Sequence, residues 1–380
     1  MFVDIHVIQS VPPSNINRDD TGSPKTAYYG GVLRSRVSSQ AWKKAVRSTF
    51  VDNVVQDGLG VRTKQAVEKL VERMKTHDPD LDAAEAQRRA KQVLEALGMK
   101  IEEVKLTKTQ QKAVDAGEAA PLGFGKTQYL VFWSNRQLDR LAELALASEA
   151  KPTKAAAKAA ADADHGLEVA LFGRMVADAA DLNVDASVQV AHAISTHAVT
   201  PEQDYYTAVD DANPEEETGA GMIGVIEFNS STLYRFATVD VEGLAANLGD
   251  AEATARAVEA FVNGFVTSMP TGKQNTFANR TIPDAVLVCI RDDRSINLVG
   301  AFEEAVVSNA GFTRASVARL VAEFHSVSSM GFAPAMVITA RGSERASALD
   351  AMSTPVPLPT LVAAVGAAVR GSHTELGSSE

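Results

Sequence analysis

The chain has 380 residues with a formal net charge of −11 at pH 7, and 45% of its residues are hydrophobic. This length is sufficient for two or three domains with their own cores. The single cysteine, Cys289, excludes a disulfide framework within the chain. No run of about 18 apolar residues predicts a membrane span, and the N-terminus lacks the basic region of a signal peptide. We therefore expect a cytoplasmic protein without membrane contact.

The first 163 residues predict a strand, a long loop, a helix and a helical segment. Residues 2–9 alternate and are rich in β-branched types, which is typical of a strand. A loop over 10–37 and a helix from about Ser39 to Val55 follow. Residues 58–163 change character and predict charged helices within 62–98, at 107–116 and at 134–148. We interpret 58–163 as a helical insertion in a β-rich body.

The body resumes with two extended runs, at 167–175 and 184–199. Residues 200–221 are polar, acidic and rich in turn residues, so they predict a long surface loop. A loop of that length in a compact domain is usually functional or disordered. The runs MIGVIEFN and LYRFATVDV, joined by Ser230–Thr232, then predict a hairpin.

The last third predicts alternating helices and strands. A helix opens at Asp250 and ends at Pro270, a buried strand covers 285–291, and a further helix and strand cover about 300–325 and 332–340. The tail from Gly371 is predicted to be disordered. Without the insertion and the long loop, the order is strand, helix, strand, strand, helix, strand. This order predicts an α+β, ferredoxin-like fold.

The stretch 17–50 is the most distinctive part of the sequence because it is basic within an acidic chain. Its seven lysines and arginines minus its two aspartates give +5. Such a local surplus indicates a polyanion-binding site. A loop carrying Arg18 leads to Gly30–Gly31, two arginines at 34 and 36, and a helix capped by Ser38 or Ser39.

On this helix the polar side chains form a ridge suited to consecutive phosphates. Gln40, Lys43 and Arg47 are spaced by three and four residues, with Lys44 beside them. The free amides at a helix start bind anions well. An ordinary solvated amphipathic helix is the alternative interpretation, which spacing alone leaves open.

Enzymatic motifs are weak in this sequence. Gly125–Lys126–Thr127 ends like a phosphate-binding P-loop, but Ala120 occupies the position of the required first glycine. His192 and His197 lack metal-ligand spacing.

Tyr205, Tyr206 and Thr207 open the long loop, where an aromatic ring could stack on a base. We expect no cofactor and no metal.

The sequence resembles the CasC-type backbone subunit of the type I-E CRISPR surveillance complex, Cascade. The resemblance is carried by motifs spread in order over about three quarters of the chain. They are NRDD…GG…RxRVSSQ…KxxxR in the basic stretch, FGRM at 172–175, VQVAHAISTH at 188–197, YYTAVDD at 205–211, IEFNSSTLYRFA, and GKQNTFA at 272–278.

The resemblance implies an RRM-like palm with helical fingers and a protruding thumb. The boundaries that we expect are palm 1–57, fingers 58–163, palm 164–199, thumb loop 200–221 and palm 222–380. RNA-binding modules of this fold usually present RNP1 aromatics. The nearest match, Gly123–Phe124–Gly125, lies in the insertion and lacks the remaining residues.

The resemblance also implies a role for particular residues. Met175 and Tyr206, with Thr207 beside it, would bracket bases flipped from a guide RNA. Lys151, Lys154 and Lys158 match a finger helix that touches target duplex DNA, although a merely solubilising alanine–lysine helix fits equally well. The residues expected to contact guide RNA are otherwise Arg18, Arg34, Arg36, Ser38, Ser39, Gln40, Lys43, Lys44, Arg47, Lys273 and Gln274.

The implied function is that of a non-enzymatic scaffold. Copies, with six as the expected number, would form a helical filament on CRISPR RNA, with other Cascade subunits, and present bases to the target DNA strand in antiviral defence. Backbone contact makes such binding independent of guide sequence. The alternative is a metal-dependent, target-RNA-cleaving subunit of the type III kind that uses Asp19 and Asp20 as oxygen ligands. Salt bridges from these carboxylates to nearby arginines are the simpler expectation.

Overall fold

The computed structural model describes residues 1–53, 59–102, 123–148, 150–163, 165–208 and 222–377. It divides into two compact units. The sheet unit comprises Met1–Phe50, Val188–Val241 and Thr254–Glu380, and the helical unit comprises Val51–Ser187 and Glu242–Ala253.

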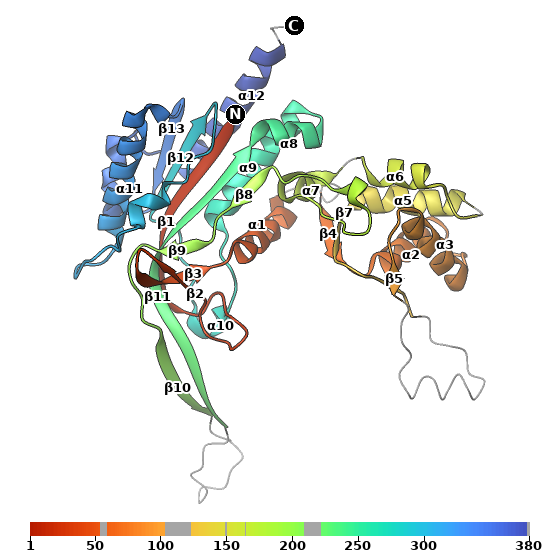
Figure 1. Ribbon diagram of the computed structural model, residues 1–380, viewed down its shortest axis with the longest axis horizontal. Helices are drawn as coiled ribbons and strands as arrows, with labels where there is room; N and C mark the ends of the chain where they lie inside the picture. The colour runs from red at the N-terminus through yellow and green to blue at the C-terminus, as the bar shows by residue number, and fades with distance from the viewer. Residues whose placement is uncertain (54–58, 103–122, 149, 164, 209–221, 378–380) are drawn as a thin grey trace, which may run out of the picture. The chain divides into compact units, whose positions relative to one another are not determined.

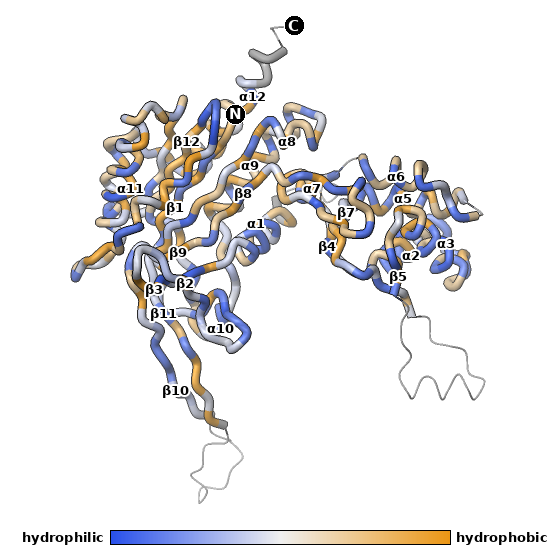
Figure 2. The backbone as a smooth tube through the Cα atoms, viewed as in Figure 1, coloured by the Kyte–Doolittle hydropathy of each residue, from blue (hydrophilic) through white to orange (hydrophobic). Residues whose placement is uncertain are grey.

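The sheet unit is built on an antiparallel sheet with β1 and β11 at its centre (Figure 1). The strand order is β13-β12-β1-β11-β9-β3-β2, and β8 and β10 also pair with β11. The strands are β1 Phe2–Ser14, β2 Thr26–Tyr29, β3 Val32–Val37, β8 Val188–Val190, β9 Ala193–Ser195, β10 Glu202–Ala208, β11 Met222–Asp240, β12 Ala285–Arg291 and β13 Met336–Arg341. Figure 2 shows hydrophobic residues along β1 and β12, as expected for strands covered on both faces.

Helices cover the sheet on both faces because residues alternate along β1. Val11 packs with Trp42 of α1, Ser39–Asn53, on one face. Ile8 packs with Leu320 of α11, Thr313–Val327, on the other. The other helices of this unit are α9 Ala251–Thr267, α10 Gln274–Phe277 and α12 Leu358–Gly377, with short helical turns η3 Leu298–Phe302, η4 Ser328–Phe332 and η5 Glu344–Ala351. The fold is thus α+β, as predicted.

Three predictions for the sheet unit were wrong in detail. The loop over 10–37 contains the β2–β3 hairpin, whose turn uses positive φ angles at Gly30 and Gly31. The predicted hairpin around Ser230–Thr232 is one continuous strand, β11. The start of the 200–221 loop is strand β10, where Tyr205, Tyr206 and Thr207 are residue types that favour strands.

The C-terminal tail was also predicted wrongly. Residues 371–377 continue helix α12, whose buried residues Leu361, Val365 and Val369 repeat every four positions. The apolar face of α12 ends at Val369, and the helix continues from there into the mostly polar residues 371–377.

The helical unit contains the helices predicted within 62–98 and at 134–148, together with two short antiparallel ladders. The helices are α2 Ala66–His77, α3 Ala83–Ala96, α5 Asn135–Ala147, α6 Lys154–Ala161, α7 Gly166–Phe172 and α8 Val241–Leu248, with the turn η2 Ala180–Leu182. The ladders pair β4 Gly60–Thr63 with β7 Val131–Ser134, and β5 Ile101–Glu102 with β6 Lys126–Thr127.

Residues 167–175 do not form the predicted strand. Most of the run lies in helix α7, where Leu167, Val169 and Leu171 are buried. The periodicity of a short apolar run does not distinguish a buried helix from a buried strand. The helical unit also extends to Ser187, beyond the predicted boundary at 163.

No helix among the described residues is long and apolar enough to cross a membrane. The helix predicted at 107–116 lies outside the described residues, as does most of the thumb loop, 209–221.

Candidate nucleic-acid interface

Ser38 caps α1 and is held in place by the Arg18 loop, residues 15–24. The Ala41 amide donates to the Ser38 Oγ at 3.3 Å, and the Ser38 amide donates to the Asn17 Oδ1 at 2.8 Å. Ser38 is therefore buried and its oxygen already accepts a bond. Ser39 is half-buried and Gln40 is exposed, so these two residues form the accessible start of the helix.

The outer surface of α1 carries the predicted basic ridge. Trp42, Val46 and Phe50 are fully buried, as their spacing predicts. Lys44 is exposed, whereas Lys43 and Arg47 are half-buried and make other contacts within the chain. Partial burial lowers the pKa of Lys43.

A buried arginine lies directly beneath this helix. The Arg235 guanidinium stacks over the Trp42 ring, with 3.8 Å between the guanidinium carbon and the ring centroid. It donates to the Gln9 Oε1 at 2.6 Å and to the Phe265 carbonyl. Burial lowers the pKa of Arg235 to about 9. Sequence reasoning missed this residue, because Arg235 and Trp42 are 193 positions apart.

The two arginines of β3 have different environments. Arg34 is fully buried and donates to the carbonyls of Tyr29, Ser195 and Phe302 at 2.9–3.1 Å. This burial contradicts the prediction that Arg34 contacts a phosphate backbone. Arg36 is half-buried, donates to the Thr26 carbonyl and lies 3.2 Å from the His192 Nδ1.

The Arg18 loop borders a depression of about 520 Å³ that also reaches the loop before α10. Arg18 is exposed there. A side chain at Gly272 would approach the Ile16 carbonyl oxygen to 2.3 Å, so the two loops can meet only because this residue is glycine. Lys273 follows with φ at 51°, an uncommon angle for a residue with a side chain. Lys273 and Gln274 therefore follow directly after the point where this loop meets the Arg18 loop.

Asp19 organises the Arg18 loop through its own hydrogen bonds. Its Oδ1 accepts from the amide and hydroxyl of Thr21 and from the Ser23 amide, at 2.7–3.0 Å. The Thr21 hydroxyl bond is the main cause that lowers the pKa of Asp19. Asp20 is exposed beside it. The predicted salt bridges of these carboxylates to arginines are not present among the described residues.

The arm is formed by β10 with residues 222–228 of β11 (Figure 1). Tyr205 and Tyr206 are adjacent in β10, so their side chains lie on opposite faces of the arm. Tyr205 is 61% exposed and Tyr206 41% exposed. The Tyr206 ring lies over Gly224, its partner across the ladder, where a side chain would approach the ring to 2.5 Å. Gly224 thereby leaves room for the ring at this position.

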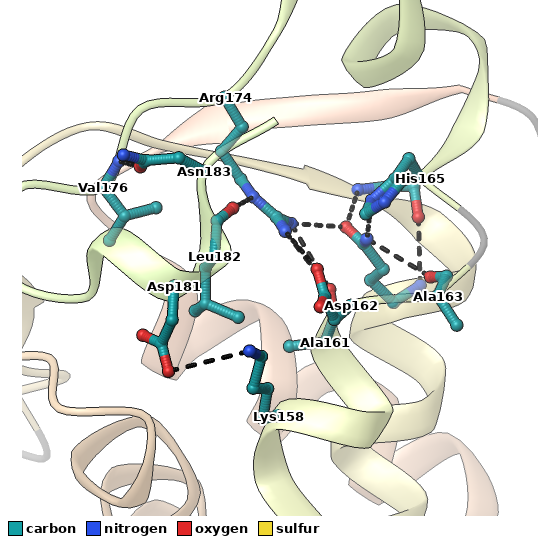
Figure 3. Close-up of polar contacts among 12 residues, drawn as sticks. Lys158, Ala161, Asp162, Ala163, His165, Arg174, Val176, Asp181, Leu182 and Asn183 are labelled. Atoms are coloured by element: carbon teal, nitrogen blue, oxygen red, sulfur yellow. Dashed lines mark hydrogen bonds and ion pairs between the residues drawn. The ribbon is translucent and has the colours of Figure 1, made fainter. Parts of the chain in front are cut away.

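Met175 is 79% exposed, immediately after Arg174, which is almost fully buried. Figure 3 shows the polar contacts of the Arg174 guanidinium. The Arg174 guanidinium donates to the Leu182 carbonyl at 2.7 Å and to the Gln137 Oε1 at 3.0 Å. Burial lowers the pKa of Arg174 to about 10. Arg174 and Val184 also form an antiparallel bridge. The contacts of Arg174 therefore hold the loop from which the exposed Met175 side chain projects.

The three finger lysines are exposed and paired with carboxylates. Lys154 and Lys158 lie 3.2 and 3.9 Å from the Asp181 Oδ2, and Lys151 lies 3.5 Å from the Glu95 Oε2. Pairs on a surface of this kind contribute little to stability. The lysines remain accessible to a competing anion.

The structure brings the α1 ridge, Arg18, Lys273 and Gln274 together in the sheet unit, which also carries Tyr206. Met175 and the finger lysines belong to the helical unit. Among the described residues, no cluster of three or more histidine, cysteine or acidic side chains could hold a metal ion.

Comparisons with known proteins support one family. No curated protein matches the sequence. A chain from a solved "CRISPR RNA-guided surveillance complex, pre-nicking" is 32% identical, with a TM-score of 0.84, and the match covers 97% of this chain and all of that one. A chain from a "CRISPR RNA-guided surveillance complex" is 28% identical, with a TM-score of 0.72 and coverage of 96% and 100%.

The family described as CT1975-like protein matches residues 3–363. This span is nearly the whole described chain and includes the basic stretch, the arm and the Gly272 loop. The chain belongs to the CT1975-like protein family.

Proposed function

We propose that this chain is a backbone subunit of a CRISPR surveillance complex, of the CasC type in a type I-E Cascade, and that it holds guide RNA. The main support is the match over 97% of this chain to a subunit chain of such a complex, at a TM-score of 0.84. The strand order β12-β1-β11-β9, with α1 and α9 on one face, supports the ferredoxin-like, RRM-like interpretation of the sheet unit.

The grip on RNA is proposed to run from the Arg18 loop across the start of α1. Arg18, Lys44 and Gln40 are exposed, and Lys43 and Arg47 line the same helix. The depression beside Arg18 extends this surface towards Lys273. Cations and amide groups in this arrangement bind phosphates without reading bases. Guide binding would therefore be independent of the spacer sequence.

The arm and Met175 are proposed to displace bases at regular intervals. The Tyr206 ring lies over Gly224 and the Met175 side chain is largely exposed, so both side chains are accessible to a base. In a head-to-tail filament, the arm of one copy would reach the guide held by the next. We further propose that six copies form the filament together with the other Cascade subunits, and that the guide pairs with the target DNA strand. The finger lysines are candidate contacts to DNA.

We propose that the subunit is not an enzyme. The Asp19 carboxylate already accepts three hydrogen bonds that shape its loop. A metal-dependent cleavage role would require Asp19 and Asp20 to bind the ion instead. Incubation of the assembled complex with complementary RNA and magnesium should leave that RNA intact. Cleavage that is lost in Asp20→Ala would support the alternative function.

The principal test is RNA co-purification from cells that express the chain with its presumed partner subunits and a repeat–spacer RNA. Wild type should retain long guide RNA, and Lys43→Glu/Arg47→Glu should lose it. The matched control is Lys64→Glu/Lys75→Glu, which reverses two exposed lysines of the helical unit. Thermal unfolding should confirm that each variant is folded. Equal RNA retention by all three proteins would place the grip elsewhere, and retention by none would contradict the proposed function.

A further inference from the structure

A second depression, of about 420 Å³, lies in the sheet unit at the start of α11. Since α11 and α1 pack on opposite faces of the sheet, this depression is distinct from the one beside Arg18. It is lined by Ser10 of β1, Ser230 and Thr232 of β11, and Arg314 and Arg345, together with His197 and residues 310–313.

The hydroxyl of Thr232 is the unexplained group at this site. Thr232 is only 5% exposed, and its hydroxyl has no hydrogen-bond partner among the described residues. Its cross-strand partner is Ser10, whose hydroxyl lies 2.7 Å from the Thr313 Oγ1 at the start of α11. Residues opposite each other in a ladder share a face, so the Thr232 side chain faces the depression. The Thr232 hydroxyl keeps access to this depression, so a ligand or water there can complete its hydrogen bonding.

The charges around the depression favour an anion. Arg314 is exposed and has no partner among the described residues. Arg345 contacts the Asp284 Oδ1 at 2.8 Å, and that carboxylate also accepts from the Ser10 amide and the Ser343 hydroxyl. Arg345 and Asp284 therefore neutralise each other, and Arg314 supplies the surplus positive charge.

Helix α11 adds to that surplus. It has 15 residues, and no side chain caps its first turn. The amides of an uncapped first turn are directed at an anion placed before the helix. His197 contributes no charge, because its Nε2 accepts from the Thr232 amide at 3.0 Å and burial lowers its pKa.

We infer that this depression is a second anion site, which takes a phosphate group between Arg314, Thr232 and the start of α11. A phosphate offers oxygens to all three kinds of donor at once. It could belong to a nucleic-acid backbone or be free inorganic phosphate. The inference that the phosphate belongs to a nucleic acid rests on the proposed function, whereas binding of free inorganic phosphate does not.

Two variants of the full chain test the site without disturbing the α1 ridge. Arg314→Gln removes an exposed cation, and Thr232→Val keeps the side-chain shape while removing the hydroxyl. The control is Arg294→Gln, an exposed arginine outside the depression. One probe is a fluorescent single-stranded RNA, titrated at several salt concentrations. The other is inorganic phosphate, followed by phosphorus NMR line broadening.

Arg314→Gln should weaken RNA binding about tenfold and reduce the salt slope by about 0.7, which corresponds to one lost phosphate contact on a single strand. Thr232→Val should also weaken binding, and the control should match wild type. If only phosphate binding responds to the variants, the site stands and its ligand is free phosphate. If wild type binds phosphate but no RNA, the proposed function fails and the site stands. If neither probe responds to either variant, the inference is overturned.

Discussion

Arg34, Arg174 and Arg235 are buried, and each donates to at least one backbone carbonyl of its own unit. Arg34 joins β3 to β9 and η3, Arg174 fastens the Met175 loop, and Arg235 supports Trp42 beneath the basic ridge. The guanidinium has five donors in a fixed plane, so one side chain can satisfy several carbonyls. If the chain binds RNA as proposed, these arginines shape the binding surface instead of touching the ligand.

The sequence could not separate these arginines from those of the surface. Arg34 and Arg36 stand two apart in one strand and look equally suited to phosphate. The burial of Arg34 depends on Ser195 and Phe302, which are 161 and 268 positions away. Ser38, by contrast, was predictable as a cap because its partner, Ala41, is three residues away.

Arg34→Met should destabilise the sheet unit without removing an RNA contact. It leaves the carbonyls of Ser195 and Phe302 unpaired, at a cost of roughly 3 kcal/mol in the free energy of unfolding. Urea denaturation measures this loss, and RNA binding per folded molecule should stay at the wild-type value. Lys44→Met, at an exposed position, is the control for stability. A folded Arg34→Met that loses RNA binding would restore Arg34 to the interface.

His6 should make the protein less stable in acid. Burial, with a smaller effect of Arg291, lowers the pKa of His6 from 6.5 to about 3. Between these values the unfolded chain binds a proton that the folded chain does not. Stability should therefore fall as the pH decreases from 6.5 towards 3, by up to about 1.4 kcal/mol per pH unit.

The measurement is urea denaturation at several pH values. His6→Gln should flatten the dependence, whereas His325→Gln, at an exposed histidine, should not. A slope unchanged in His6→Gln would show that other groups cause the acid sensitivity.

At the scale of elements, long periodic helices were predicted well and the strands near the arm were not. The start of α1 at Ser39 and the run of α5 are confirmed because cap and apolar stripe agree locally. Strand β11 was divided at Ser230–Thr232 because hydroxyl residues favour turns. There the strand passes from pairing with β10 to pairing with β1, and this cross-strand pairing is invisible in the local sequence.

Gly224→Ala tests whether the arm needs the Tyr206 ring in its present position. The added methyl would meet the ring at 2.5 Å and displace it, whereas Tyr206→Phe keeps the ring. In the assembled complex, 2-aminopurine placed at a displaced guide base should report the change by fluorescence. We expect Gly224→Ala to resemble Tyr206→Ala, with a loss of about 1–3 kcal/mol of base stacking. Tyr205→Ala should have a smaller effect, since Tyr205 lies on the other face of the arm.

At the scale of the whole molecule, the sequence predicted one insertion in a β-rich body, and the structure has two units with different limits. The helical unit includes residues 166–187, which follow the predicted insertion, and part of α8, which lies far from it in the sequence. Asn247 of α8 donates to the carbonyls of Ala170 and Asp185, at 3.1 and 3.0 Å. Such a return of the chain depends on tertiary contacts, so no change in composition marks it.

If copies polymerise on guide RNA, the mass of the complex should grow in steps. Each added binding segment of spacer should add one chain of 40.3 kDa together with its RNA. Native mass spectrometry of complexes with progressively longer spacers measures the steps. The Lys64→Glu/Lys75→Glu protein should show the same steps. A copy number that does not change with spacer length would contradict RNA-templated assembly.

The continuity of β11 restricts how the arm can vary in length. Residues 222–228 and 231–240 belong to one strand, so the arm takes its orientation from the register of β11 against β1. Inserting one residue between them would turn the Tyr206 and Tyr205 faces over while leaving the central sheet unchanged. Two added residues would restore the faces and lengthen the arm. Engineered insertions at this junction should therefore preserve the faces of the arm only when they add an even number of residues.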